Sequence, residues 1–172
     1  NPQEYIDYFK QWTDEGYEVI HISLGSSLSS SHQNAKLAAE ELGNVFVIDS
    51  GNLSTGMGLL VIEAAERIAN GVPSSQIYEE VVALKSKVNA SFVIDSLTYL
   101  REGGRCSALQ AFSANLLNIK PSITVDNTDG KMTVGKKYRG SLKKVLNRYV
   151  KDQLKDRTDL KLDRVFITHS GT

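Results

Sequence analysis

The sequence predicts an α/β protein with two domains. Residues 1–80 are expected to form a parallel-sheet N-terminal domain, and residues 81–172 a mixed α+β domain with an antiparallel hairpin. Two observations predict this class. Short apolar runs alternate with longer amphipathic stretches in the first half, and Asp129-Gly130 separates two alternating runs in the second. The chain opens at a helix cap and stops after an apolar run, so each domain is expected to be incomplete at that end.

The first half predicts a strand–helix–strand unit followed by two helices. Asn1-Pro2 is a helix start, because Asn caps the first turn and Pro suits the first helical position. A strand–helix–strand unit of this length typically pairs its strands in parallel. The expected elements are a helix opened by Asn1, a strand at 19–24, helix 31–42, strand 45–48, helix 56–69, and a helix from Pro73 to about Asn89.

The second half predicts antiparallel pairing. A run opened by Pro121 faces a second run across Asn127-Thr128-Asp129-Gly130, which is a hairpin signal. Gly103-Gly104 interrupts the helical pattern. The expected elements are strand 91–94, a short helix 97–101, a helix from Ser107 to about Asn118, strands 122–126 and 131–134, a helix from Ser141 to about Leu154, and a last strand 164–168.

Composition excludes several classes. Lys and Arg number 20, as do Asp and Glu, and this zero balance argues against a nucleic-acid partner. No apolar run reaches membrane-span length and no signal-peptide pattern opens the chain, so we expect a cytoplasmic protein without stable membrane insertion. Cys106 is the single cysteine, which rules out an internal disulfide or a cysteine-based zinc site. We expect no metal and no cofactor.

Three motifs are considered and set aside. Residues 130–137 nearly spell a phosphate-binding loop, but they form the second arm of the predicted hairpin and end in Lys137. The 25–29 segment lacks the second glycine of the G-x-S-x-G elbow of serine hydrolases. Histidines 21, 32 and 169 show no metal-ligand spacing and are interpreted as packed or surface imidazoles. Cys106 is interpreted as a small apolar residue, and Asp49 and Asp95 as caps of the turns that follow their strands.

The segment after the first predicted strand is rich in hydroxyl groups. Six serines occur within residues 23–31, directly before the predicted helix 31–42. A helix start offers unpaired N–H groups and attracts anions, and serines add further donors. The alternative is an ordinary polar turn in which one serine caps the helix. The loop alone leaves both interpretations open.

Several fragments together resemble a known family. Residues 22–33 resemble the motif I-S-I-S-S-x-L-S-G-T-Y-Q, with Gly25, Ser30, Ser31 and His32 departing from it. Further matching blocks follow in the family's order: Val47–Ser50, Val93–Leu100, Gly103–Arg105, Leu116–Pro121 and Gly135–Gly140. The chain is therefore similar to the DegV family of fatty-acid-binding proteins over nearly its whole length.

The resemblance implies two α/β domains that clasp one long-chain fatty acid. It also implies that the bound acid is presented to a separate fatty acid kinase, which forms an acyl phosphate, so the chain is not an enzyme alone. The family binds the carboxylate through a threonine of a T-S-Q-P segment, a serine of the hydroxyl-rich loop, and a histidine of a late G-x-H-x-G-P-G motif. Only the loop serines are present here, and His169 does not take the place of that histidine.

The site residues follow from the loop and from two arginines. We expect Ser29 and then Ser26 to bind the carboxylate, with Ser27 beside them, because Ser29 is expected to cap the helix. Arg105 and Arg139 are expected to face the kinase, because guanidinium groups suit phosphate geometry. Apolar residues at 59–65 and 109–117 are candidates to line the tail. A small serine hydrolase with a Ser26 or Ser29 nucleophile, or a module without ligand, remain the alternatives.

Overall fold

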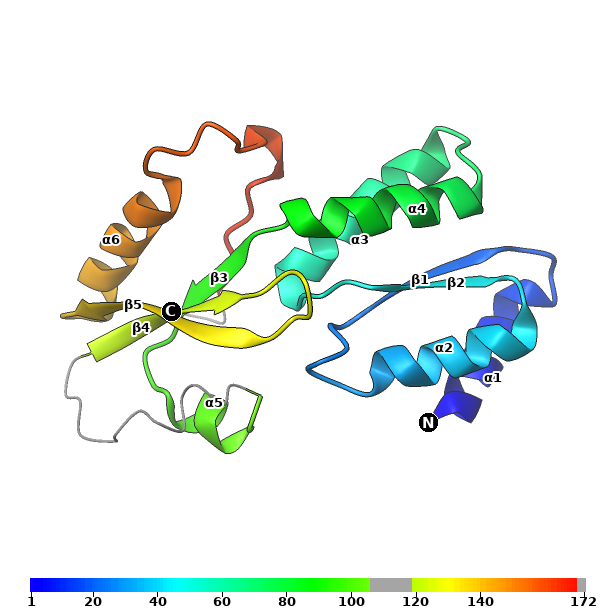
Figure 1. The fold of residues 1–172 in the computed structure, drawn as a ribbon, viewed down its shortest axis with the longest axis horizontal. Coiled ribbons are helices and arrows are strands. Elements are labelled where there is room, and N and C mark those ends of the chain that lie inside the picture. Colours follow the sequence, from blue (N-terminus) through cyan, green and yellow to red (C-terminus); the bar gives the residue numbers. More distant parts are fainter. Residues whose placement is uncertain (106–118, 170–172) are drawn as a thin grey trace. The chain divides into compact units, whose positions relative to one another are not determined.

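The computed structural model describes residues 1–105 and 119–169, and the chain forms two compact units (Figure 1). Unit 1 comprises Asn1–Asn89 together with Asp126–Lys131. Unit 2 comprises Ala90–Val125 together with Met132–Thr172. Unit 1 is therefore built from two separate stretches of the chain.

Unit 1 has the alternating order that the sequence predicts. Its two strands pair in parallel, with Val19 opposite Val45 and Ser23 opposite Asp49, which confirms the predicted strand–helix–strand unit. The Asn1 side chain accepts from the Glu4 N–H at 3.1 Å, and this is the expected helix cap. The elements are α1 (Pro2–Thr13), β1 (Val19–Ser23), α2 (Ser31–Leu42), β2 (Val45–Asp49), α3 (Ser54–Ala69), α4 (Ser74–Leu84) and the 3₁₀ turn η1 (Lys85–Lys87).

Helices cover both faces of the two-stranded sheet. On one face α1 and α2 bury Ile6, Phe9, Ala35 and Ala38 against the strands. On the other face α3 and α4 form a second core, which contains Ile48, Leu60, Ala64, Ile77, Val81 and Val88. Because successive strand residues point to opposite faces, Val19 joins the first core whereas Ile20 and Ile22 join the second. This explains why the strands are apolar on both sides.

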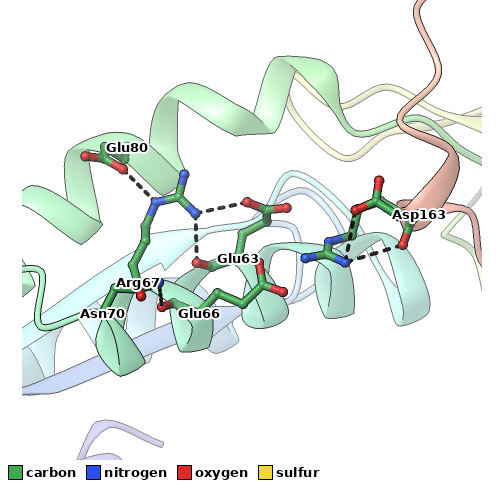
Figure 2. A network of polar contacts seen from close by, with 7 residues as sticks. Glu63, Glu66, Arg67, Asn70, Glu80 and Asp163 are labelled. Atoms are coloured by element: carbon green, nitrogen blue, oxygen red, sulfur yellow. Dashed lines mark hydrogen bonds and ion pairs between the residues drawn. The ribbon is translucent and has the colours of Figure 1, made fainter.

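A polar bridge joins α3 to α4 at the edge of the second core. Arg67 Nε donates to Glu80 Oε2 at 2.6 Å, and Arg67 Nη1 donates to Glu63 Oε2 at 2.9 Å (Figure 2). These hydrogen bonds to two carboxylates raise the pKa of Arg67. Arg67 thus adds a polar connection to the apolar contacts between these two helices.

Unit 2 contains a three-stranded antiparallel sheet in the order β3-β4-β5. The predicted hairpin is confirmed, and its ladder extends from Val125 opposite Met132 to Ile119 opposite Arg139. The register shifts between Pro121 and Ile123, where β5 has one residue more than β4. The elements are β3 (Ala90–Val93), α5 (Thr98–Glu102), β4 (Ile119–Val125), β5 (Met132–Arg139), α6 (Leu142–Leu154) and the 3₁₀ turn η3 (Leu162–Arg164).

Helix α6 packs on this sheet through buried Val145 and two tyrosines. The rings of Tyr138 and Tyr149 meet edge to face at 6.2 Å between centroids. The Tyr149 hydroxyl lies 2.6 Å from Ser91 Oγ, and the Tyr138 hydroxyl donates to Asp152 at 2.9 Å. The polar ends of both tyrosines are therefore bonded, while Tyr138 is buried and Tyr149 is half-buried.

One predicted element is wrong and one lies outside the described residues. Residues 165–168 form no strand, although the run is apolar, because within the described ranges no neighbouring strand supplies a ladder to it. Phe166 and Ile167 are exposed. The predicted helix from Ser107 to about Asn118, the apolar positions 109–117 and Cys106 all lie outside the described residues.

Candidate functional site

Two polar loops leave the same end of the parallel sheet. The serine loop (residues 24–30) follows β1, and the loop formed by residues 50–53 follows β2. Because Ser23 lies opposite Asp49 in the parallel register, both loops start side by side. The expectation that the serines and Asp49-Ser50 share one sheet end is confirmed.

Asp49 holds the serine loop with both carboxylate oxygens. Its Oδ1 accepts from the backbone N–H of Ser26 at 3.1 Å and of Gly51 at 2.9 Å. Its Oδ2 accepts from the Ser26 hydroxyl at 2.6 Å. The bond to Gly51 is the turn-capping contact expected from the sequence, and the two bonds to Ser26 were not expected.

The environment of Asp49 favours its ionised form. Burial acts to raise the pKa of this carboxyl, but the hydrogen bonds from Ser26 and Gly51 and the positive charge of Lys85 outweigh burial. The net effect lowers the pKa of Asp49 below its ordinary value. Asp49 therefore carries its charge at neutral pH.

A second set of contacts connects the serine loop to the loop formed by residues 50–53. The Gly25 N–H donates to the Asn52 carbonyl at 2.8 Å, and Ser50 Oγ bonds both the N–H and the carbonyl of Asn52. Asn52 is 0% exposed, and its side chain packs directly against Gly56. A Cβ added to Gly56 would stand only 2.0 Å from Asn52 Oδ1, so a larger residue at position 56 would clash. Within the described part of the chain its Nδ2 is buried without a partner.

A third segment reaches the serine loop from far along the chain. The β4–β5 turn, Asp126–Lys131, belongs to unit 1. Glycines allow the turn to approach the two loops closely. A Cβ added to Gly130 would stand 3.3 Å from Gly25 Cα and 3.3 Å from Ser27 Oγ. A Cβ added to Gly51 would stand 2.6 Å from the Asn127 carbonyl oxygen. Asn127 in turn donates to the carbonyls of Ser86 and Val88. We call Gly25, Gly51 and Gly130 the glycine junction.

The expected binding serines differ in their surroundings. Ser26 and Ser27 are exposed, and Ser29 is half-buried. The N-cap of α2 is Ser30, whose side chain makes no capping bond, so the prediction that Ser29 is the cap is wrong by one residue. Ser29 Oγ instead accepts from the Ser31 N–H at 3.2 Å, which a serine one residue before the cap can do.

The histidines take no catalytic position beside Ser26 or Ser29. His32 Nδ1 lies 2.9 Å from Ser23 Oγ, but Ser23 is 3% exposed and donates to the Ile48 carbonyl. His21 packs edge to face against Tyr5 and Phe9; burial and then the charge of His32 lower the pKa of His21. His169 is exposed. A triad needs a nucleophile within reach of its base, and the two proposed nucleophiles lack one in the described contacts.

The other candidate residues lie in unit 2. Arg105 and Arg139 are both exposed, as expected; Arg105 bonds the Gly103 carbonyl at 2.7 Å, and the Arg139 carbonyl accepts from Arg148. Residues 132–137 lie within strand β5, so the rejection of the phosphate-loop motif is confirmed. The expectation for Asp95 is wrong: its carboxylate pairs with Lys120, and Ser96 Oγ accepts from the Thr98 N–H instead.

Sequence reasoning missed the partners of the serine loop. The Asp49–Ser26 pair could have been inferred from the parallel register, since both residues follow adjacent strand ends. The contact of the hairpin turn with Gly25 carries no local signal, because it joins residues about a hundred positions apart. In residues 1–105 and 119–169, no cluster of three His, Cys, Asp or Glu side chains is arranged for a metal ion. Within the same ranges no helix is long and apolar enough to cross a bilayer.

Polar loops at the carboxyl ends of parallel strands are the usual ligand-binding edge of open α/β sheets. The fold and this loop pair thus define the class as an α/β protein with a candidate ligand-binding edge. The chain belongs to the DegV family, whose model matches residues 1–172. The family resemblance and the α/β fold class predicted from the sequence are therefore confirmed.

Curated relatives support the assignment over most of the chain. A DegV domain-containing protein of Clostridium perfringens is 35% identical over 146 residues, which cover 84% of this chain and 52% of the relative. One from Clostridium acetobutylicum is 34% identical over 170 residues, covering 97% of this chain and 59% of the relative. The chain thus spans about half the length of the curated relatives it matches.

Solved structures share the fold and have been described with fatty acids. DegV from Bacillus subtilis, a fatty acid binding protein, is 30% identical with a TM-score of 0.74, over 91% of this chain and 55% of that one. A fatty-acid-binding DegV family protein from Thermus thermophilus is 29% identical with a TM-score of 0.72, over 87% and 54%. The Streptococcus pneumoniae Fatty Acid Kinase (Fak) B3 protein loaded with linoleic acid is 28% identical with a TM-score of 0.75, over 90% and 55%.

Proposed function

We propose that this chain binds one long-chain fatty acid, with the carboxyl head group at Ser26, Ser27 and Ser29. We further propose that it acts in the cytoplasm as a carrier subunit, which presents the head group to a separate fatty acid kinase for acyl-phosphate formation and is not catalytic alone. The observation that carries the proposal is the clamped serine loop at the sheet's ligand-binding edge, in a chain whose solved relatives hold fatty acids.

The head group and the tail of a fatty acid contribute differently to the binding free energy. A buried head group needs several hydrogen-bond partners, because an unpaired polar group in a low dielectric is costly. Bonds to a charged group contribute about 1.5–3 kcal/mol each, and each buried methylene contributes about 0.8 kcal/mol. The tail therefore sets affinity, and the serine loop sets orientation. Of the α3 positions considered for the tail, Leu60 and Ala64 belong to the core of unit 1.

Native mass spectrometry of the gently purified protein tests the carrier function. The expected spectrum shows the protein with the added mass of one fatty acid, and delipidated protein regains that mass after incubation with oleic acid. A clean ligand-free mass that persists after this incubation would overturn the proposal.

The serine hydrolase is tested separately. Ser26 bonds a carboxylate rather than a histidine, so we expect only background hydrolysis of p-nitrophenyl esters. Turnover that a serine-directed fluorophosphonate abolishes would support the hydrolase instead.

A further inference from the structure

The Ser26 hydroxyl has its single hydrogen committed to Asp49. The Ser26 Oγ to Asp49 Oδ2 distance is 2.6 Å, typical of a strong bond from a hydroxyl to an ionised carboxylate. Asp49 cannot rotate away freely, because its Oδ1 accepts two backbone N–H groups at the same time. A serine hydroxyl has one hydrogen and two lone pairs. Ser26 therefore offers only lone pairs to anything that approaches from the exposed side.

We propose that Asp49 is a positioning residue that makes Ser26 a hydrogen-bond acceptor, so that the head group at Ser26 is a protonated carboxyl rather than a carboxylate. This inference rests on the proposed function. The ligand O–H then donates to Ser26 Oγ, which donates to Asp49. The ligand's carbonyl oxygen accepts from Ser27 or Ser29, and no covalent bond changes. A free fatty acid is ionised at neutral pH, so its proton comes from the buffer on binding.

Electrostatic repulsion also favours a protonated head group beside Asp49. Two carboxyl groups that share a site cannot both ionise without strong repulsion, and the one in the less favourable environment keeps its proton. The pKa of Asp49 is lowered below its ordinary value by its hydrogen bonds and Lys85, against the effect of burial, so Asp49 stays ionised and the ligand stays neutral. Other titratable groups on the surrounding segments of unit 1 include His32, Lys36, Glu40 and Glu41 of α2, and Asp126, Asp129 and Lys131 of the β4–β5 turn.

Asp49→Asn is expected to turn the Ser26 hydroxyl from a hydrogen-bond donor toward residue 49 into an acceptor, while the backbone bonds keep the loop in place. The asparagine Oδ1 can still accept from the Ser26 and Gly51 N–H groups, which both use that atom in the wild type. The new Nδ2 donates to Ser26 Oγ in place of the accepting Oδ2, so the serine hydrogen becomes free to point toward the ligand. The variant site accepts a carboxylate, and one negative charge beside it is gone.

Calorimetry of lauric acid binding, below its critical micelle concentration, measures the protonation directly. Titrations at neutral pH in buffers of different ionisation enthalpy report the protons taken up. The wild type is expected to take up about one proton per laurate, and its affinity to fall about tenfold per pH unit above the ligand pKa. Asp49→Asn is expected to take up about none, and its affinity to change little with pH.

Two further variants separate the role of Asp49 from general effects. Ser26→Ala lacks the acceptor and is expected to lose the proton uptake and bind laurate more weakly. Asp7→Asn removes the same charge from exposed α1, where the carboxylate bonds only Gln3 in the described contacts, and should keep the uptake. Wild-type binding without proton uptake, or unchanged uptake in Asp49→Asn, would overturn this inference alone. Absence of laurate binding in the wild type would overturn the proposed function as well.

Discussion

Ser29 Oγ accepts a hydrogen bond from the Ser31 N–H at 3.2 Å, immediately before helix α2. The hydroxyl hydrogen of Ser29 has no acceptor in the described contacts, unlike that of Ser26. Ser29 is therefore the half-buried serine best placed to donate to a ligand.

Ser29→Gly is expected to weaken fatty acid binding with little loss of stability. Glycine near a helix start costs only a few tenths of a kcal/mol, whereas a lost bond to a head group oxygen costs about 1.5–3 kcal/mol if the group carries charge and about 0.5–1.5 kcal/mol if it is neutral. Calorimetry for affinity and chemical denaturation for stability measure the two effects. Equal affinities of wild type, Ser26→Ala and Ser29→Gly would reduce this loop to a polar turn.

Asn1→Ala provides the reciprocal control. Asn1 caps α1 in a capping box with Glu4, so its removal is expected to cost about 0.5–2 kcal/mol of stability. Fatty acid affinity should not change. A loss of affinity equal to that of Ser29→Gly would show that the binding assay reports stability alone.

Gly51→Ala should destabilise unit 1. Gly51 has φ +55°, and a Cβ there would stand 2.6 Å from the Asn127 carbonyl oxygen. Backbone strain of this kind costs about 1–3 kcal/mol. Gly58→Ala is the matched control, because α3 leaves open space around Gly58, and it should gain about 0.4–1 kcal/mol. Equal unfolding midpoints of the two variants in urea would contradict the glycine junction.

Tyr138 gives unit 2 a stability that is lost at high pH. Burial, the hydrogen bond to Asp152 and its charge raise the pKa of Tyr138 from 10.0 to about 12. The unfolded chain releases this proton first, so the contribution of Tyr138 to the free energy of unfolding should be constant below pH 10 and fall as pH rises to about 12. Denaturation across this range should show a shallower fall for Tyr138→Phe, and an unchanged slope would contradict the assignment.

Arg67→Ala is expected to loosen the α3–α4 bridge. It removes bonds to Glu63 and Glu80, and because these groups are partly exposed the loss should shrink as salt rises. Leu60→Ala, at a position 1% exposed, should cost about 2–5 kcal/mol independently of salt. Denaturation at low and high salt separates them, and a larger effect for Arg67→Ala would contradict this ranking.

Arg139→Ala and Arg105→Ala are expected to keep the fatty acid and lose phosphorylation. Both side chains are exposed, and guanidinium groups suit contacts with phosphate or a kinase surface. Native mass spectrometry measures the retained ligand, and a kinase assay with loaded protein measures acyl-phosphate formation. An Arg139→Ala variant that loses fatty acid, yet is phosphorylated normally once reloaded, would refute this role.

Local patterns predicted most elements of the fold. The capped start at Asn1, helix α2 at Ser31–Leu42 and the hairpin across Asp129-Gly130 follow from caps, periodicity and turn chemistry. The run 164–168 was mispredicted because β-propensity says nothing about whether a partner strand is adjacent.

The candidate site was only partly predictable. The serine loop and its place at the sheet end followed from the strand–helix–strand order. The direction of the Ser26 hydroxyl did not, because it depends on an oxygen of Asp49 that reaches the loop only in the folded register. The cap of α2 was placed at Ser29 instead of Ser30, since neighbouring serines have the same propensity.

The division of unit 1 into two stretches sets an order for its biosynthesis. A ribosome releases Asn1–Asn89 before it makes Asp126–Lys131. At roughly 5–20 residues per second, the intervening synthesis takes on the order of seconds, which is long compared with the formation of helices. The nascent sheet and its helices thus meet water at Gly25 and Gly51 until the hairpin emerges. The contacts between the serine loop and the hairpin turn therefore form late, when two distant parts of the growing chain meet.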